Sequence, residues 1–148
     1  MTYSLQELSD KLELQELSWT YSNAIDTQDF DILDDVFVPD AFIDYTAMGG
    51  PEGSYAEIKK FLQEALVNFP DYYHLNSNQQ ITLNGDTATG RVMCFNPMGI
   101  PQPEGSPHVM MLGLFYKDEY VRTVDGWRIA RREEERSWSY NVPQGFPG

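Results

Sequence analysis

The spacing of apolar residues changes once along this chain, at Pro70, and that change constrains the fold more than any other feature. Before Pro70, apolar residues recur every three or four positions, the period of an amphipathic helix. After it, apolar and polar residues alternate in runs separated by turn dipeptides, the pattern of strands. Helices followed by a run of strands predict an α+β domain, with the helices on one face of a mostly antiparallel sheet. Because the chain has 148 residues, close to the common size of one domain, we expect a single domain spanning residues 1–148, with its core over about 5–140.

Two capping boxes mark helix starts in the first half of the chain. In each, a serine and a glutamate three residues later satisfy each other's unpaired backbone amides. Ser4 and Glu7 predict a helix from Leu5 to about Asp26. Ser54 with the glutamate three residues on predicts a second long helix, which we expect Pro70 to stop.

The segments between and after these helices are less regular. A short acidic helix is expected over residues 29–37, ended by Pro39, with a first strand over residues 41–47. The proline-rich segment 97–107 holds four of the nine prolines and predicts a long exposed loop. Four strands are expected around it, over residues 74–83, 87–95, 108–120 and 127–140.

The charge balance excludes several classes of partner. Ten Lys and Arg residues stand against 23 Asp and Glu residues, a formal net charge of −13. Such a chain repels phosphate backbones and anionic lipid, so neither nucleic acid nor a membrane surface is expected as a partner. No apolar run of about 18 residues occurs, and a single cysteine, Cys94, fits a reducing compartment. We therefore expect a cytoplasmic protein.

Of the two histidines, His74 stands directly before a predicted strand. Histidine switches readily between base and acid near neutral pH, but a general base needs a partner that orients it. Asp26, at the end of the first predicted helix, is a candidate partner, with Trp19 on a nearby turn. The residues alone leave a purely structural reading open, in which His74 packs at a strand end and Asp26 ends a helix.

Several common chemistries lack their motifs. The sequence contains no HExxH, CxxC, GxSxG, P-loop or GxGxxG pattern. The two histidines and the scattered carboxylates have no metal-ligand spacing, so no metal site is expected. Cys94 falls within a predicted strand and is expected to be buried rather than reactive.

A set of modest motifs in a fixed order carries a family resemblance over residues 5–138. They are Tyr-x4-Asp ending the first helix, FDILDDVFVPDAFIDY, YAEIKKFLQEAL, YYHLNSN, NGDTATGRV and YKDEYVRTVDGWRIARREEE. Together they resemble the SnoaL-like branch of the nuclear-transport-factor-2-like superfamily, which includes scytalone dehydratase, hexachlorocyclohexane dehydrochlorinase and bile acid 7α-dehydratase. The resemblance implies a cone-shaped α+β barrel, a curved sheet wrapped on three N-terminal helices around a pocket. It also implies a homodimer or homotrimer that needs no cofactor.

The resemblance further implies roles for individual residues. His74 and Asp26 fall on the positions of a His–Asp dyad, with His74 as the base. Tyr21 and Tyr45 match tyrosines that polarise a substrate oxygen, although simple packing is an equal alternative for Tyr45. The residues expected to bind substrate are Trp19, His108, Arg132, Arg136 and Trp138.

Strict alternation along the last strand predicts two opposite faces. One face would carry Arg128, Ala130, Arg132, Glu134, Arg136 and Trp138, and the other Trp127, Ile129, Arg131, Glu133 and Glu135. The acidic run 133–135 is interpreted as a solvated strand edge. An exposed ladder of cross-strand ion pairs is the alternative interpretation of the arginines.

The resulting hypothesis is a cofactor-independent lyase or isomerase. It would remove a proton next to an electron-withdrawing group of a small hydrophobic polycyclic, terpenoid or steroid-like substrate, followed by elimination or a double-bond shift. One alternative is a non-catalytic domain that binds a small molecule or assembles through the same fold. Another is a hydrolase of epoxides or esters in which Asp26 activates water.

Overall fold

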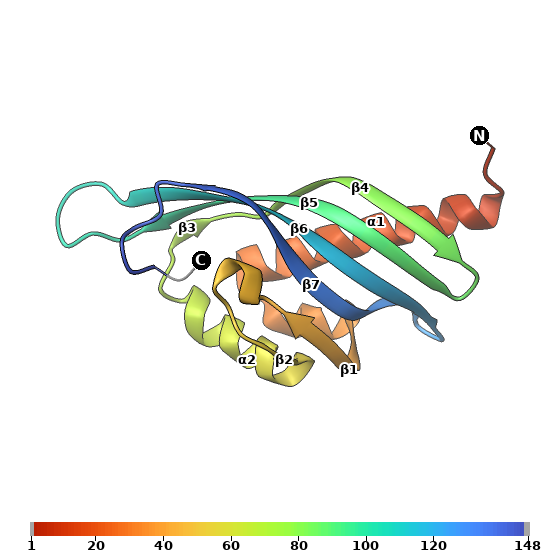
Figure 1. The fold of residues 1–148 in the computed structure, drawn as a ribbon. Helices are drawn as coiled ribbons and strands as arrows, with labels where there is room; N and C mark the ends of the chain where they lie inside the picture. Colours follow the sequence, from red (N-terminus) through yellow and green to blue (C-terminus); the bar gives the residue numbers. More distant parts are fainter. Residues whose placement is uncertain (1, 147–148) are drawn as a thin grey trace.

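The computed structural model describes residues 2–146 and contains two long helices and seven strands (Figure 1). The helices are α1 (Leu5–Thr27) and α2 (Tyr55–Leu66), with two short 3₁₀ helices, η1 (Phe30–Asp35) and η2 (Thr46–Met48). The strands are β1 (Phe37–Asp44), β2 (Glu52–Ser54), β3 (Asp71–Tyr72), β4 (Leu75–Asn84), β5 (Thr87–Ile100), β6 (His108–Thr123) and β7 (Gly126–Tyr140). None of the described helices is both long and apolar enough to cross a membrane.

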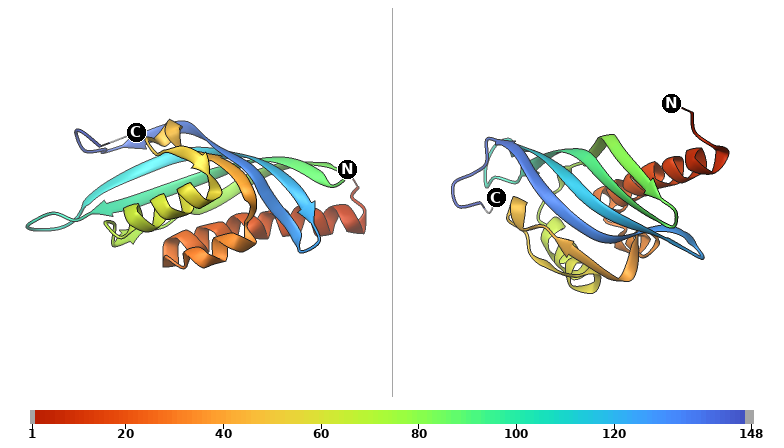
Figure 2. Two further views of the ribbon diagram at one scale, coloured as in Figure 1. Left: turned by 90° about the horizontal axis from the view of Figure 1, so that it is seen from below. Right: turned by 45° about the vertical axis from the view of Figure 1, so that its right-hand side comes forward.

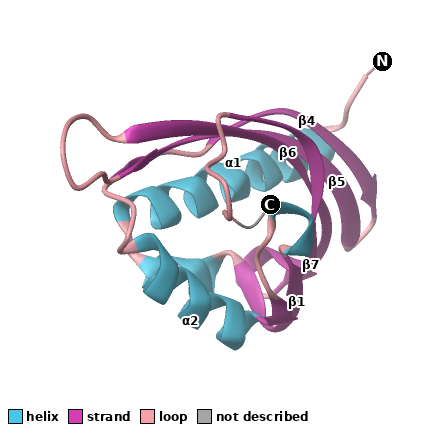
Figure 3. Ribbon diagram, turned by 60° about the vertical axis from the view of Figure 1, so that its left-hand side comes forward, coloured by secondary structure: helices cyan, strands magenta, loops and turns pink. Residues whose placement is uncertain are grey.

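All seven strands form one curved sheet. Its order is β2-β1-β7-β6-β5-β3, and β4 also pairs with β5, beside β3. Every pairing is antiparallel except that of β1 with β7, which is parallel. The sheet arches over α1 and α2, which lie on its concave side (Figures 2 and 3). The predicted α+β class is confirmed, as a half-barrel with mixed but mostly antiparallel pairing.

Both predicted capping boxes are present and set the helix starts. The Ser4 amide donates to Glu7 Oε2 at 2.7 Å, and the Glu7 amide donates back to Ser4 Oγ at 3.2 Å. Ser54 and Glu57 repeat this arrangement at the start of α2. Such a cap contributes about 1 kcal/mol to helix stability, because it satisfies amides that the helix leaves unpaired.

Two prolines lie within strands rather than ending an element, so the predicted boundaries there were wrong. Pro39 is in β1, where pairing with β7 is irregular between Phe37 and Phe42, so its missing amide breaks no regular ladder. Pro97 is in β5, opposite the gap between β3 and β4, so neither of these two strands pairs with it. The strand therefore continues to Ile100, and the predicted loop 97–107 shortens to residues 101–107.

The strict alternation predicted for β7 was also wrong, because its pairing with β6 shifts twice. One shift lies between Glu119 and Tyr120 of β6, where Ala130 is the extra residue on β7. A bulge of this kind reverses which side chains face the core. As a result Trp127 and Ile129 are buried before the shift, and Arg132 is buried after it, all against the same core.

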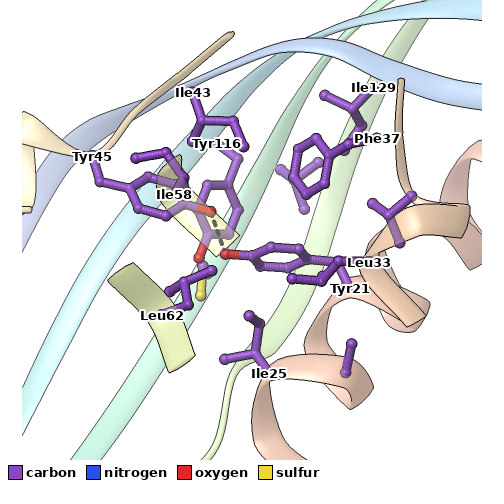
Figure 4. Packing of buried hydrophobic residues seen from close by; sticks show 14 of the residues in the cluster. Tyr21, Ile25, Leu33, Phe37, Ile43, Tyr45, Ile58, Leu62, Tyr116 and Ile129 are labelled. Atoms are coloured by element: carbon purple, nitrogen blue, oxygen red, sulfur yellow. Dashed lines mark hydrogen bonds between the residues drawn. The ribbon is translucent and has the colours of Figure 1, made fainter. Parts of the chain in front are cut away.

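The core fills the space between the concave face of the sheet and the helices (Figure 4). Leu33, Ile43 and Ile129 are fully buried there, and burying a side chain of this size stabilises the fold by about 1.5–3 kcal/mol. Aromatic rings pack in this core as well: the Tyr21 ring meets Phe37 and Tyr116 edge to face. These tyrosines continue from the core into the cavity described next.

Candidate active site

A cavity of about 290 Å³ lies between the sheet and the helices. Apolar side chains from α2 and from the C-terminal segment form much of its wall, and a smaller set of polar groups comes from α1, β5, β6, β7 and the ends of β1 and β3. The lining residues that carry polar groups are Tyr21, Tyr45, His74, Asn96, Tyr116 and Glu134. The apolar ones include Phe61, Leu62, Phe69, Met98 and Phe146.

His74 and Asp26 meet at this cavity. His74 Nδ1 lies 2.8 Å from Asp26 Oδ1, and the His74 backbone amide donates to both carboxylate oxygens at 3.1 and 3.0 Å. Because a carboxylate only accepts, Nδ1 is assigned the hydrogen, which leaves the lone pair of the neutral ring on Nε2. The arrangement is that of a histidine base held in one tautomer by a carboxylate.

Three further hydrogen bonds fix the last turns of α1 against the segment that carries His74. The Tyr72 hydroxyl donates to the Ile25 carbonyl at 2.7 Å, directly beside Asp26. Asn76 Nδ2 donates to the Ser18 carbonyl at 3.1 Å and to Ser22 Oγ at 2.7 Å. These contacts, on both sides of the dyad, hold Asp26 next to His74 although the two residues are 48 positions apart in the sequence.

Three tyrosine side chains line the same cavity as His74. The hydroxyls of Tyr21 and Tyr45 are 2.6 Å apart, and the Tyr116 hydroxyl points toward the same place (Figure 4). In the Tyr21–Tyr45 pair one hydroxyl donates to the other, so the accepting tyrosine keeps its own hydrogen for a further partner. The cavity thus presents phenol donors to an oxygen atom of a ligand.

The phenols are held in their neutral, donating form. Burial raises the pKa of Tyr21, Tyr45 and Tyr116 above the ordinary value, although the nearby Arg132 charge works against this for Tyr21 and Tyr45. A phenol donates a hydrogen bond only while it keeps its proton. Desolvation therefore preserves the donors that an oxygen in the cavity would need.

Arg132, one of the predicted binding residues, lies beneath the phenols rather than in the cavity wall. Its guanidinium donates from Nε and Nη2 to the two oxygens of Asp118, each at 2.8 Å, and both side chains are fully buried. The same guanidinium lies 4.3 Å from the centre of the Tyr21 ring and 4.1 Å from that of Tyr116. Arg132 therefore supports the two rings from below.

The structure does not bring the other predicted binding residues to the cavity. Trp19 is half exposed on the outer side of α1, and the Arg136 guanidinium donates to Ser139 Oγ. Trp138 stacks on Phe95 on the convex face of the sheet. His108 bonds through Nε2 to the carbonyl of residue 141 at 2.7 Å, so it anchors the C-terminal segment.

Three polar cavity residues were missed in the sequence: Tyr116, Asn96 and Glu134. Asn96 is buried, and its Nδ2 donates to the Tyr73 carbonyl at 2.9 Å. The interpretation of run 133–135 as a solvated edge was wrong for Glu134, because the bulge in β7 turns this side chain inward. For Tyr116 the alternation of β6 was an available signal, since it places this residue on the same face as Leu112 and Leu114.

Comparison with known proteins places the chain in a family. A family model described as a SnoaL-like domain matches residues 6–133. The chain belongs to the SnoaL-like family. An uncharacterized protein of Mycobacterium tuberculosis is 50% identical to this SnoaL-like chain over 133 residues, covering 90% of the chain and 89% of the relative.

Solved structures share the SnoaL-like fold along nearly the whole chain. A candidate aromatic ring hydroxylase from Novosphingobium aromaticivorans has a TM-score of 0.81 and 26% identity, covering 91% of this chain and 94% of its own. A candidate scytalone dehydratase from the same organism has a TM-score of 0.79 and 20% identity, covering 95% and 97%. A hexachlorocyclohexane dehydrochlorinase has a TM-score of 0.78 and 16% identity, covering 96% and 99%. The predicted membership of the nuclear-transport-factor-2-like superfamily is confirmed.

The described residues offer little for holding a metal. Among residues 2–146, no group of three or more His, Cys, Asp or Glu side chains is placed to bind an ion. Burial raises the pKa of the Cys94 thiol to about 12, so it stays protonated. The chemistry that the cavity itself offers is a histidine base, phenol donors and a second carboxyl group.

Proposed function

We propose that this protein is a cofactor-independent lyase or isomerase. In this proposal His74 removes a proton from a carbon next to a carbonyl group, and elimination or a double-bond shift follows. The observation that carries the proposal is the His74–Asp26 contact of 2.8 Å at a cavity that also holds the hydrogen-bonded Tyr21 and Tyr45. The same fold is shared with proteins named as a candidate dehydratase and a dehydrochlorinase.

The proposed steps use only side chains of this chain. Nε2 of His74 takes the proton while Asp26 stabilises the imidazolium through Nδ1. The electron pair moves onto the carbonyl oxygen, which accepts a hydrogen bond from the phenol of the Tyr21–Tyr45 pair whose hydrogen is not donated within the pair. One such donor in a site without water contributes about 3 kcal/mol to stabilisation of the transition state. The enolate then collapses with loss of a leaving group or is protonated at a different carbon.

The cavity favours a small, uncharged, apolar substrate. Ligand pockets commonly span about 300–1,000 Å³, so a volume of about 290 Å³ favours one or two rings over a four-ring steroid. Phe61, Leu62 and Phe69 present apolar surface to such rings. Among the expected substrates, a compact bicyclic or monoterpenoid carbonyl compound fits best.

Two other functions have weaker support. A non-catalytic binding domain would need no dyad, yet His74 in the cavity wall lies at hydrogen-bond distance from the Asp26 carboxylate. A hydrolase in which Asp26 activates water would need that carboxylate in the cavity wall. Asp26 is not among the residues that line the cavity, and it bonds to the backbone amide and the ring of His74 instead. Assembly into a homodimer or homotrimer stays a prediction.

Exchange of the α-hydrogens of a bicyclic ketone, α-tetralone, for deuterium in heavy water tests the first step without knowledge of the natural substrate. NMR would follow the exchange. His74→Ala should slow the catalysed exchange by about 100-fold or more, the usual contribution of a general base. Asp26→Asn should also slow it, because the amide can reverse the tautomer of the ring.

The fold should survive His74→Ala, because the backbone amide of residue 74 still donates to Asp26. The matched control is His108→Gln, which changes the other histidine but keeps a side-chain donor for the carbonyl of residue 141. Exchange at the wild-type rate in His74→Ala would sink the proposal. So would an equal loss in His108→Gln.

A further inference from the structure

The cavity contains a second carboxyl group that the steps above do not use. Glu134 lines the same cavity as His74 but comes from β7, directly across the ladder from Tyr116 of β6. Its Oε2 atom is buried and has no hydrogen-bond partner among the described residues. A buried carboxyl oxygen without a partner is costly, and such groups are concentrated at functional sites.

The neighbours of Glu134 in sequence show that its environment is unusual. Glu133 pairs with Lys117 at 3.3 Å, and Glu135 pairs with Arg91 at 2.6 Å, both on partly exposed side chains. Of the three consecutive glutamates, only Glu134 faces the cavity. Glu135 therefore provides a matched control on the same strand.

The surroundings of Glu134 favour the protonated acid. Burial raises its pKa to about 8, and the Asp44 charge acts in the same direction. Arg132 opposes this shift, but its guanidinium already donates to both oxygens of Asp118. The other titratable groups that line the cavity are Tyr21 from α1, Tyr45 after β1, His74 before β4 and Tyr116 from β6, while α2 contributes only apolar side chains. At neutral pH the site therefore combines a histidine base with a carboxylic acid.

We propose that Glu134 is the general acid that protonates the leaving oxygen, so that the reaction is a dehydration of a β-hydroxy carbonyl compound. This rests on the proposed function, in which His74 is the base. The C–H bond breaks and its proton goes to His74 Nε2, while its electron pair forms the new C=C bond through the enolate. The C–O bond breaks, and the leaving oxygen takes the proton of Glu134 and departs as water. Proton exchange with solvent then returns His74 and Glu134 to their starting forms.

The proposal follows from the chemistry of the leaving group. Hydroxide is a poor leaving group in an apolar cavity, because its charge would be desolvated there. A proton delivered as the C–O bond breaks removes that charge, which is general acid catalysis. A halide needs no such proton. Glu134 should thus matter for loss of water and not for loss of chloride.

Two probe compounds separate these cases: β-hydroxytetralone and its β-chloro analogue, which give the same naphthol on elimination. Glu134→Gln should lower turnover of the hydroxy compound by about 100-fold or more and change that of the chloro compound little. Glu135→Gln should leave both unchanged. His74→Ala should lower both, because each elimination begins with the same proton transfer.

The pH profile of the unmodified protein gives a second test that does not depend on a variant. Turnover of the hydroxy compound should fall as pH rises through about 8, where Glu134 loses its proton, and turnover of the chloro compound should not. A constant ratio of the two rates across this range overturns the role of Glu134. Equal losses on both compounds in Glu134→Gln overturn it as well.

Failure of the proposed function would look different. If His74→Ala keeps full activity on both compounds, or if the unmodified protein converts neither, the base chemistry is wrong. Infrared spectroscopy then still tests Glu134 by itself. The carbonyl stretch of a protonated carboxylic acid should be present near neutral pH and absent in Glu134→Gln, and its absence from the unmodified protein overturns the proposal.

Discussion

Arg132 and Asp118 place a full ion pair under the phenols, and both side chains are inaccessible to solvent. Arg132→Met should be strongly destabilising, by about 3–5 kcal/mol, because it leaves the Asp118 charge buried without its partner. The double variant Arg132→Met with Asp118→Leu should recover most of this loss. Urea unfolding of the wild type, the two single variants and the double variant measures the difference.

Additive losses in that double variant would contradict the interpretation, because they would mean that the two charges do not compensate each other. Asp118 also accepts from the Tyr120 hydroxyl at 3.0 Å. Some loss is therefore expected to remain in the double variant. The recovery should still exceed half of the single-variant loss.

At this scale the family resemblance placed the dyad and the tyrosine pair correctly, but the binding residues that it also implied, such as His108 and Arg136, lie away from the cavity. His74 meets Asp26 and Tyr21 meets Tyr45, each by a direct hydrogen bond. Glu134 could not be assigned to the cavity, because the alternation of residue types along β7 gives no sign of the register shift that turns its side chain inward. Short motifs show which residue types occur, but a bulge decides where they point.

Between elements, Gly113 allows β6 and β7 to pair beneath the indole of Trp138. Gly113 lies opposite Trp138 in the ladder, and a Cβ atom at this position would overlap the indole ring. Gly113→Ala should therefore destabilise the protein by about 1–3 kcal/mol, because Trp138 must leave its stack on Phe95. Thermal unfolding followed by circular dichroism measures the loss.

The companion variant is Gly113→Ala combined with Trp138→Ala. Removal of the indole removes the overlap, so the pair should cost less than the sum of the single changes. If the two losses simply add, the contact between the indole and residue 113 is not what restricts this position.

Element boundaries were predictable where the signal is local. Both capping boxes set helix starts correctly, because each cap is made by residues three apart. The loop predicted to begin at Pro97 was wrong because the deciding signal there is not local. Whether a strand tolerates a proline depends on what lies beside it, and the gap between β3 and β4 is a property of the assembled sheet.

At the scale of the whole molecule, Asp10 of α1 holds the helix to the end of the sheet that lies far from the cavity. This buried carboxylate accepts from both terminal nitrogens of Arg122, at 2.8 and 2.9 Å, and from the Trp127 indole at 3.1 Å. The Arg122 guanidinium holds the pKa of Asp10 well below its usual range. Asp10 thus ties the first turns of α1 to the hairpin of β6 and β7.

This lowered pKa predicts a loss of stability in acid. A carboxyl group whose pKa is lower in the folded state contributes stability above its unfolded pKa, near 3.8, and that contribution is lost as pH falls below it. Between about pH 6 and pH 3, the wild-type protein should lose more unfolding free energy than Asp10→Asn. Urea unfolding at the two pH values measures this.

Asp86→Asn is the matched control for that measurement. Asp86 bonds the same guanidinium, at 2.9 Å, but its side chain is 85% exposed, so water screens the pair. The Asp86 variant should follow the wild-type acid profile. An acid profile of Asp10→Asn that matches the wild type would assign the acid loss to other carboxylates.

The overall class could be predicted because a change of period from helical to alternating is visible along the whole chain. The parallel pairing of β1 with β7 could not, since these strands lie at opposite ends of the sequence and no local pattern records their contact. That pairing nevertheless brings Tyr45, which follows β1, to the same cavity as Glu134 of β7. The site therefore depends on the longest-range contact in the sheet.

The position of Phe146 has a practical consequence for work with the protein. This residue packs against Phe69 and lines the cavity, whereas α1 starts at the far end of the molecule (Figure 1). An affinity tag fused after Phe146 would emerge beside the cavity and compete with small molecules for its apolar wall. A tag fused before α1 would leave the wall free. A fluorophore placed near the C-terminal end would, by the same geometry, report when the cavity is filled.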